Sequence, residues 1–277
     1  MLDVSPHIAP QQRVHGRAAV VIGSDGRVVD LHQSGAAKAM LPRMHGRPPE
    51  VVFLNTAGGV TGGDRLSYAL EVAAGATVVG TTQTAERAYR SSAGTGRIET
   101  RLTVGAGATL AWLPQEVIVF EGARLDRVLE ADLDATARLI TCETLVLGRR
   151  AMGEHLRDIG LTDRRRVRRA GRVIGHEAIG LDASALSSGA PAGLGPATAL
   201  ATVCLFASDA PDQLDRVQAA LPPGPAKGLP GLRAAASAWD GRLVVRLLGA
   251  DAQDLRRALA RIVTTLTAAD LPRVWQS

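Results

Sequence analysis

Apolar and polar residues alternate along most of the first 180 residues, a pattern typical of β-strands with one buried face. The alternating segments cover residues 17–22, 28–32, 51–54, 117–120, 138–147 and 164–174. Glycines occupy nearly every gap between them, and almost no segment in this part has the periodicity of a helix. The pattern therefore predicts a β-rich core over about residues 14–180.

A weak internal repeat runs through this core. Residues 70–78, 102–110 and 133–139 each combine an alternating strand, a turn of small residues and the start of another strand. The copies recur at a spacing of about 30 residues, which is typical of stacked supersecondary units in solenoids. The fold class expected from this repeat is mainly β, with stacked sheets in a solenoid-like, β-helix-like arrangement.

Helical signals lie near the end of the chain. Residues 213–221 follow a capping acid and an early proline, and a second helix is expected from about residue 251 to residue 268. The second helix carries apolar residues at helical spacing, and this face either meets a partner or, more commonly, covers the protein's own core. These residues are Leu255, Leu259, Ile262, Val263 and Leu266.

Strands are also expected around the first of these helices. Residues 232–239 and 242–248 flank Asp240-Gly241, which is a strong hairpin signal, and residues 197–207 form a further apolar strand. Residues 184–196 are rich in small residues, glycine and proline, and predict a surface loop. We therefore expect one domain over residues 1–277, with the β-rich core followed by a strand and helix portion over residues 197–277.

Composition limits the class of protein. Apolar residues make up 46% of the 277 residues but aromatic residues only 3%, so the core must consist mainly of alanine, valine and leucine. No apolar run reaches the roughly 18 residues that a membrane-spanning helix needs. Residues 1–12 lack the pattern of a secretory signal, and Cys142 and Cys204 form neither a metal-ligand spacing nor a disulfide framework. A cytoplasmic protein without membrane contact is expected.

The net charge of +5 is carried almost entirely by arginine, and Asp163 is followed by an arginine-rich run over residues 164–169. Such a run forms a solvated strand or turn, a surface for docking proteins, or a binding site for RNA. Aromatic side chains that could stack on bases are few, and no nucleic-acid-binding motif is present. Nucleic acid is therefore not an expected partner, although an arginine-rich RNA-binding β protein stays open as an alternative.

The most unusual segment covers residues 55–64, where Gly58, Gly59, Gly62 and Gly63 precede Asp64. It is not a phosphate-binding P-loop, because that motif needs Lys and then Ser or Thr where this chain has Asp64 and Arg65. The paired glycines also do not fit the dinucleotide fingerprint. Two interpretations remain: a tight turn or bulge between strands, or a glycine-lined site with Asp64 as its one charged group.

Several blocks together resemble the UreD-type urease accessory proteins, called UreH in some bacteria. The blocks cover residues 48–64, 81–87, 112–123, 147–154 and 271–275, and the match is densest from about residue 38 to residue 154. The resemblance implies a β-rich fold of stacked sheets with two helices near the end. The family motif corresponds here to Asn55, Gly58, Gly59, Gly62, Gly63, Asp64, Thr82, Gln83, Glu86, Arg87, Gly148, Arg149, Gly153 and Glu154.

Acidic residues are the candidates for chemistry, because the histidines are unpaired and no serine sits in a G-x-S-x-G elbow. A carboxylate inside a β-rich core must be paired, protonated or solvated. Pairing with Arg87, Arg149 or another arginine is one interpretation. The other is a water-filled route for a divalent cation, since carboxylates bind such ions loosely. The residues considered for this route are Asp64, Glu116, Glu143 and Glu177.

The resemblance implies a non-enzymatic assembly factor for urease. Such a protein binds apo-urease and a UreF-type accessory protein, which in turn docks a UreG-type GTPase whose GTP hydrolysis drives nickel transfer. We expect no tightly bound cofactor, with nickel only in transit along the route of carboxylates. A stand-alone nickel metallochaperone is an alternative, but it would need clustered histidines or cysteines, which the sequence lacks. An enzyme is the least favoured alternative, because no complete catalytic constellation is present.

Overall fold

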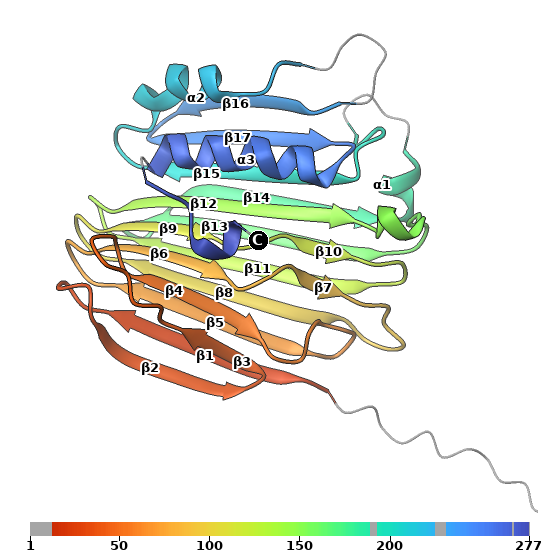
Figure 1. Cartoon of the computed structure of the whole chain (residues 1–277), viewed down its shortest axis with the longest axis horizontal. Coiled ribbons are helices and arrows are strands. Elements are labelled where there is room, and N and C mark those ends of the chain that lie inside the picture. Colours follow the sequence, from red (N-terminus) through yellow and green to blue (C-terminus); the bar gives the residue numbers. More distant parts are fainter. Residues whose placement is uncertain (1–12, 189–192, 225–230, 268, 277) are drawn as a thin grey trace, which may run out of the picture.

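Two β-sheets packed face to face form the body of the computed structural model, which describes residues 13–188, 193–224, 231–267 and 269–276 (Figure 1). Within this part, one sheet has seven strands and the other ten, and we call them sheet A and sheet B. The strands of sheet A are β14 (Arg172–Asp182), β13 (Gly160–Arg169), β11 (Arg124–Leu133), β8 (Gly96–Val104), β5 (Arg65–Val72), β1 (His15–Ile22) and β2 (Val28–Gly35), in spatial order.

Sheet B runs alongside and extends further. Its main path, in spatial order, is β16 (Arg233–Trp239), β17 (Arg242–Gly249), β15 (Ala199–Phe206), β12 (Arg138–Leu147), β9 (Thr109–Leu113), β6 (Thr77–Thr82), β4 (Glu50–Asn55) and β3 (Ala37–Met40). Two short strands, β10 (Val117–Val119) and β7 (Glu86–Ala88), pair beside β12.

The chain winds between the sheets as a solenoid. Strands β1, β5, β8, β11 and β13 are parallel neighbours in sheet A, and β4, β6, β9 and β12 are parallel neighbours in sheet B. Leu70 lies opposite Leu102, as the first two copies of the sequence repeat predict, whereas Leu133 lies opposite Val104. The third copy is thus offset by two residues, which keeps its side chains on the same face. The solenoid-like fold expected from the sequence is confirmed.

Small residues are needed where each coil turns from sheet A to sheet B. Gly75 and Gly107 have φ angles of +75° and +63°, which favour glycine. The turns also stack closely, because Gly75 N donates to Ala106 O at 2.9 Å and a Cβ on Gly105 would lie 2.7 Å from Ala74 N. The repeated small-residue turns therefore follow from this stacking.

Strands β9, β12, β15 and β17 of sheet B are covered on both faces. Their inner face packs on sheet A, and their outer face packs on α2 (Leu214–Ala220) and α3 (Ala252–Thr267). The five apolar residues of α3 named above are all buried in this outer core, so the helix covers its own protein, as predicted. A short 3₁₀ helix, η3 (Arg273–Trp275), adds Trp275, whose Nε1 donates to Leu113 O at 3.0 Å.

The predicted hairpin at Asp240-Gly241 is present between β16 and β17, and both residues have positive φ. A single strand over residues 164–174 is wrong, because the chain reverses at Ala170-Gly171 between β13 and β14. The expected loop over residues 184–196 is also partly wrong. It begins within α1 (Ala183–Ser187), where Asp182 Oδ1 accepts from Ala185 N at 2.9 Å.

Residues 1–12, to which the expectation about a secretory signal refers, lie outside the described residues. Across the described ranges, the longest helix falls short of the length and apolarity that crossing a membrane requires.

Candidate functional site

The first four motif blocks lie along one side of the solenoid, opposite the small-residue turns (Figure 1). Backbone hydrogen bonds connect each block to the next: Val60 N donates to Arg87 O at 2.7 Å, Phe120 N to Ala88 O at 3.0 Å, and Gly148 N to Val119 O at 2.8 Å. The blocks are therefore successive layers of one surface, although they lie far apart in the sequence.

The glycine-rich segment of residues 55–64 is a close-packed turn in this surface. A Cβ on Gly59 would lie 2.2 Å from Tyr89 Cε2, and a Cβ on Gly62 would lie 1.9 Å from Ser91 Oγ. The buried carboxylate of Asp64 accepts from Val14 N at 2.8 Å and from Thr61 N at 2.9 Å. The turn interpretation thus accounts for the glycines, and Asp64 holds the turn closed.

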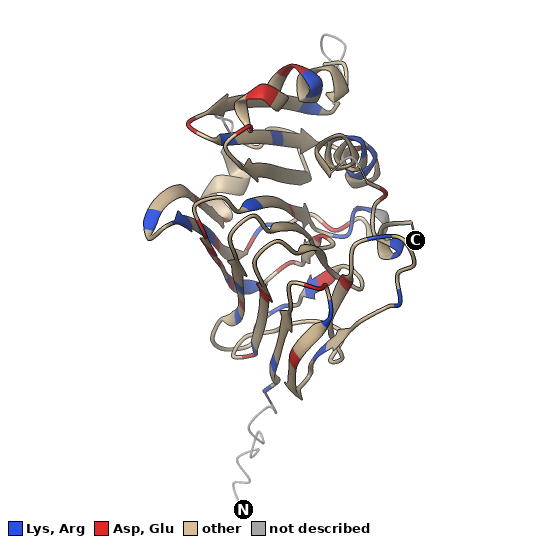
Figure 2. Cartoon of the chain, turned by 90° about the vertical axis from the view of Figure 1, so that its left-hand side faces the viewer, with Lys and Arg blue, Asp and Glu red and all other residues tan. Residues whose placement is uncertain are grey.

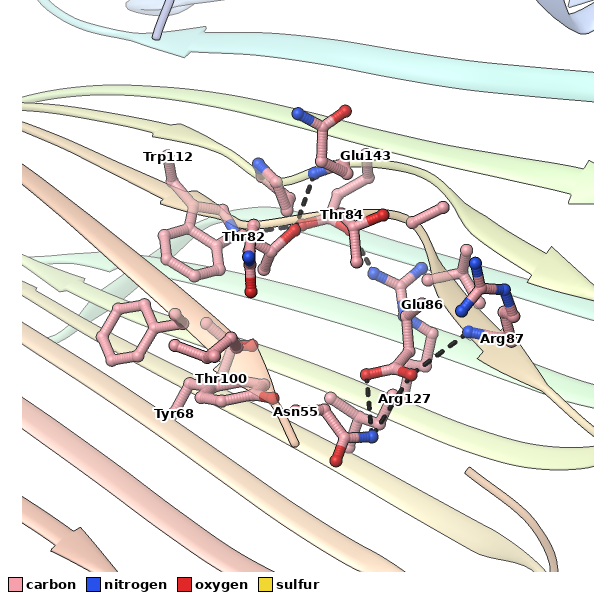
Figure 3. A pocket seen from close by; sticks show the side chains of 18 of the residues that line it. Asn55, Tyr68, Thr82, Thr84, Glu86, Arg87, Thr100, Trp112, Arg127 and Glu143 are labelled. Carbon is pink, nitrogen blue, oxygen red and sulfur yellow. Dashed lines mark hydrogen bonds and ion pairs between the residues drawn. The ribbon is translucent and has the colours of Figure 1, made fainter. Parts of the chain in front are cut away.

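A cavity of about 70 Å³ lies behind this surface, between the two sheets (Figure 3). Its volume has room for several water molecules. Motif residues line part of it, and Tyr68, Arg127 and Glu143, which lie outside the motif blocks, line another part (Figure 3). We call it the motif cavity. The motif side chains that line it are Asn55, Thr82, Gln83, Glu86 and Arg87.

Glu86 is the motif acid in this cavity. Its carboxylate accepts from Asn55 Nδ2 at 3.3 Å and from its neighbour Arg87 N at 3.1 Å (Figure 3). Burial raises the pKa of Glu86, and the hydrogen bonds from Arg87 and Asn55 only partly offset this effect. Glu86 therefore takes up a proton more readily than an exposed glutamate does.

Glu143 begins a line of alternating charges at the inner wall of the cavity. It projects from β12, where it is 3% exposed, and its carboxylate accepts from Trp112 Nε1 at 3.2 Å and from Arg127 of sheet A. Arg127 NH1 in turn contacts Asp163 Oδ2 at 2.9 Å. Glu143 is thus paired with arginine, as one of the two interpretations of the buried acids expects.

The line continues from Asp163 across the interior. Arg165 NH2 lies 2.7 Å from Asp163 Oδ2, and Arg165 NH1 lies 3.2 Å from Glu177 Oε2. Glu177 Oε1 lies 2.5 Å from Arg246 NH2 on β17. We call these residues the interior charge network: Glu143, Arg127, Asp163, Arg165, Glu177 and Arg246.

The electrostatics of the network favour charged side chains at its centre. Burial alone would raise the pKa of Asp163, but Arg127 and Arg165 hold it below its ordinary value. Burial would lower the pKa of Arg127, whereas Asp163 and Glu143 raise it above its ordinary value. Asp163 and Arg127 therefore stay ionised in the interior because they are paired.

A second cavity, of about 80 Å³, lies at the other end of the network, and we call it the far cavity. Arg165, Glu177 and Arg246 line it together with Arg242 and Cys204. The network thus runs from the motif cavity to the far cavity, where the side chain of Arg246 is 63% exposed and the line of charges reaches the surface.

The structure brings together only two of the four acids considered for a cation route. Glu143 and Glu177 belong to the network, and Asp64 holds the glycine-rich turn. Glu116 faces the helical side, where it pairs with Arg256 of α3 at 3.0 Å. Among the described residues, no group of three or more histidine, cysteine, aspartate or glutamate side chains is arranged to hold a metal ion.

Arg127 and Asp163 are parts of this site that the sequence does not predict. Asp163 carried a signal, because it shares the strand face of Arg165 two residues on, and this face is buried. Arg127 carried no comparable signal, since its partners lie in other coils. Of the suggested arginine partners, Arg149 pairs with Glu154 at 3.1 Å and not with a network acid.

The arginine run is divided between the two faces of β13. Arg165 points inward, while Arg164, Arg166 and Arg168 point outward toward acids of the neighbouring strand β11. Arg164 lies 2.8 Å from Asp126, and the other two lie 3.6 and 3.7 Å from Glu130. Basic and acidic residues both occur on the coils of the solenoid (Figure 2). This pairing disfavours a phosphate-binding surface on the outward face of the run.

Fold and site together define a β-solenoid protein with a line of paired charges between two cavities. A profile of the UreD urease accessory protein family matches residues 14–276. The chain belongs to this family.

Relatives with the name urease accessory protein UreD are similar over almost their whole length. The relative from Jannaschia sp. (strain CCS1) is 56% identical over 100% of both chains. That from Dinoroseobacter shibae is 52% identical over 96% of this chain and 93% of its own. That from Paracoccus denitrificans is 49% identical over 97% and 95%, respectively.

Proposed function

We propose that this chain is a non-enzymatic assembly factor that acts in the maturation of urease. Membership of a family of urease accessory proteins supports this role. In the proposed complex, the chain binds apo-urease and a UreF-type protein, and the latter docks a UreG-type GTPase that supplies the GTP hydrolysis. The chain itself contributes a scaffold and a path for nickel in the cytoplasm.

The observation that carries the nickel path is the interior charge network. Glu143, Asp163 and Glu177 are spaced along it and separated by arginines, so each carboxylate has a cation beside it when no metal is present. A divalent cation that displaced a guanidinium would meet oxygen ligands, and these bind such ions weakly enough for release. In this proposal nickel moves from one cavity toward the other by exchange with Arg127 and Arg165.

The chemistry of the donors favours passage over storage. A tight nickel site would use a cluster of imidazole or thiolate ligands. Cys142 and Cys204 are both buried, and burial raises the pKa of each thiol, which disfavours the thiolate that binds metal. The stand-alone metallochaperone is therefore the weaker candidate.

Reconstitution tests the proposed role. The chain is co-purified with apo-urease and the UreF- and UreG-type proteins, and urease activity is measured after nickel, bicarbonate and GTP are added. We expect a stable complex and activity that depends on both this chain and GTP hydrolysis. Equal activation without the chain would refute the role as an assembly factor.

A further inference from the structure

Sheet B extends beyond the edge of sheet A at the end of the solenoid that contains the far cavity. Strand β14, at the edge of sheet A, lies opposite β17, because Arg246 contacts Glu177 and Arg242 NH1 donates to Ile174 O at 2.8 Å. Strand β16 is the next strand beyond β17 in sheet B. Its inner face is therefore left without an opposing strand in the described part of the molecule.

The inner face of β16 is exposed. Ala235 and Ser237 are small and exposed, and Trp239 is 38% exposed. The alternate residues of β16 pack instead on the outer core, beneath the helices. Figure 2 shows α3 end-on beside these upper strands, on the outer side of sheet B. The inner face of β16 thus resembles half of an interface between two sheets.

Strand β14 offers a free edge beside this face. In the described residues it pairs with β13 on one side only. Its sequence has no proline or lysine to block edge pairing, and Val173 on it is 57% exposed. An added strand next to β14 would continue sheet A and cover the inner face of β16.

The side chains at this place carry unpaired positive charge. Arg242 stacks on Trp239, with 4.3 Å from its Cζ to the ring centroid, and forms no ion pair within the described ranges. Its Nε is one of two buried side-chain polar atoms that lack a hydrogen-bond partner there, the other being Arg169 Nε. Arg169 lies nearby, since a Cβ added at Gly241 would be 3.6 Å from its NH1.

We propose that an extended acidic segment of a partner protein adds as a strand to the free edge of β14. Its backbone pairs with β14, its small or β-branched side chains cover Ala235 and Ser237, and a carboxylate reaches the guanidinium of Arg242 where it lines the far cavity. Strand addition supplies backbone hydrogen bonds, and the arginine fork selects a carboxylate. Charge complementarity makes this segment acidic, whereas a second copy of the chain would bring the same arginines and be repelled.

Hydrogen exchange tests the proposal directly. The probe is a synthetic peptide of about eight residues that alternates glutamate with threonine, a composition suited to a strand. We expect it to slow amide exchange in β14 of the full-length protein but not in β2, the opposite edge of sheet A. A peptide with glutamine in place of glutamate should bind at least about tenfold more weakly, because it lacks the charge-assisted contact.

Variants separate the site from general electrostatics. Arg242→Gln should lower affinity for the acidic peptide at least about tenfold. Arg261→Gln changes the net charge equally at an exposed position on α3 and should leave the affinity unchanged. Ser237→Glu provides a second test at an exposed position that leaves Arg242 intact, and it should also weaken binding.

Three results would overturn the proposal. The first is unchanged exchange in β14 at millimolar peptide, and the second is equal affinity of the Arg242→Gln variant. The third is preferential protection of β14 by another occupant. A single-stranded RNA would show this by displacing the peptide at lower concentration, and a second copy of the chain would show it as protection that rises with protein concentration alone.

Discussion

Replacing Glu143 by leucine should destabilise the protein because it breaks the interior charge network at a buried position. The side chain of Glu143 is 4% exposed and that of its partner Arg127 is 12% exposed. Removal of one partner from a buried ion pair costs about 3–5 kcal/mol. Arg127 keeps Asp163, although it shares this acid with Arg165, so the lower end of the range applies. Loss of the acceptor for Trp112 Nε1 adds about 1 kcal/mol.

The expected total is therefore about 4 kcal/mol, which corresponds to a fall in Tm of roughly 8–16 °C. The double variant Arg127→Met, Glu143→Leu should cost less than Glu143→Leu alone, because it leaves no unpaired cation and Asp163 retains Arg165. Urea unfolding of the wild type, of the single variants Arg127→Met and Glu143→Leu, and of the double variant gives the coupling free energy between the two positions.

The matched control is Glu130→Leu, on the outward face of β11, where Glu130 contacts Arg166 and Arg168 at 3.6 and 3.7 Å. Exposed pairs of this kind contribute about 0–1 kcal/mol. Two results would contradict a buried, paired network. The first is a loss of stability in Glu143→Leu no larger than in this control, and the second is a double variant that is no more stable than Glu143→Leu alone.

Other predictions concern the glycine-rich turn, the motif cavity and the outer core. Gly62→Ala should lower the free energy of unfolding by about 1–3 kcal/mol through overpacking, since its Cβ would lie 1.9 Å from Ser91 Oγ. Gly58→Ala meets open space and should lower it by only about 1 kcal/mol, because of the positive φ at this position. Thermal unfolding distinguishes the two variants. Because burial raises the pKa of Glu86, the folded state binds its proton more tightly than the unfolded state, and wild-type stability relative to Glu86→Gln should fall as pH rises above the ordinary value of 4.5. Thermal melts of both proteins between about pH 4 and pH 7 measure this difference, and a constant difference would contradict it. Trp275→Ala should cost about 3–5 kcal/mol in urea unfolding, because the indole is buried and donates to Leu113 O; a cost below about 1 kcal/mol would show that η3 does not close the outer core.

Local patterns predicted the strands and helices well. The strand predicted over residues 138–147 coincides with β12, although β12 is buried on both faces and not on one, and the Asp240-Gly241 signal marks a hairpin that is present. The reversal at Ala170-Gly171 was missed because alternation continues through it and alanine rarely adopts the φ of 45° that it has there. Polarity alone therefore did not separate β13 from β14.

The site was harder to predict because it depends on pairing between coils. A buried acid such as Glu143 is visible in the sequence as a charge within an apolar strand. Its partner Arg127 becomes evident only when the packing of sheet A on sheet B is known, since the two residues belong to opposite sheets. The glycine-rich segment posed the opposite problem: it suggested a site, whereas close packing against Tyr89 and Ser91 accounts for it.

The nickel content of urease matured in the presence of a Glu143→Gln variant tests the proposed path most directly. Glutamine keeps an oxygen acceptor for Arg127 and Trp112 but removes the negative charge, so the complex should still assemble. We expect an intact complex and a urease with clearly less nickel per active site than with wild type or with the control Glu130→Gln. An intact complex that yields urease with normal nickel content would contradict passage of the metal along this network.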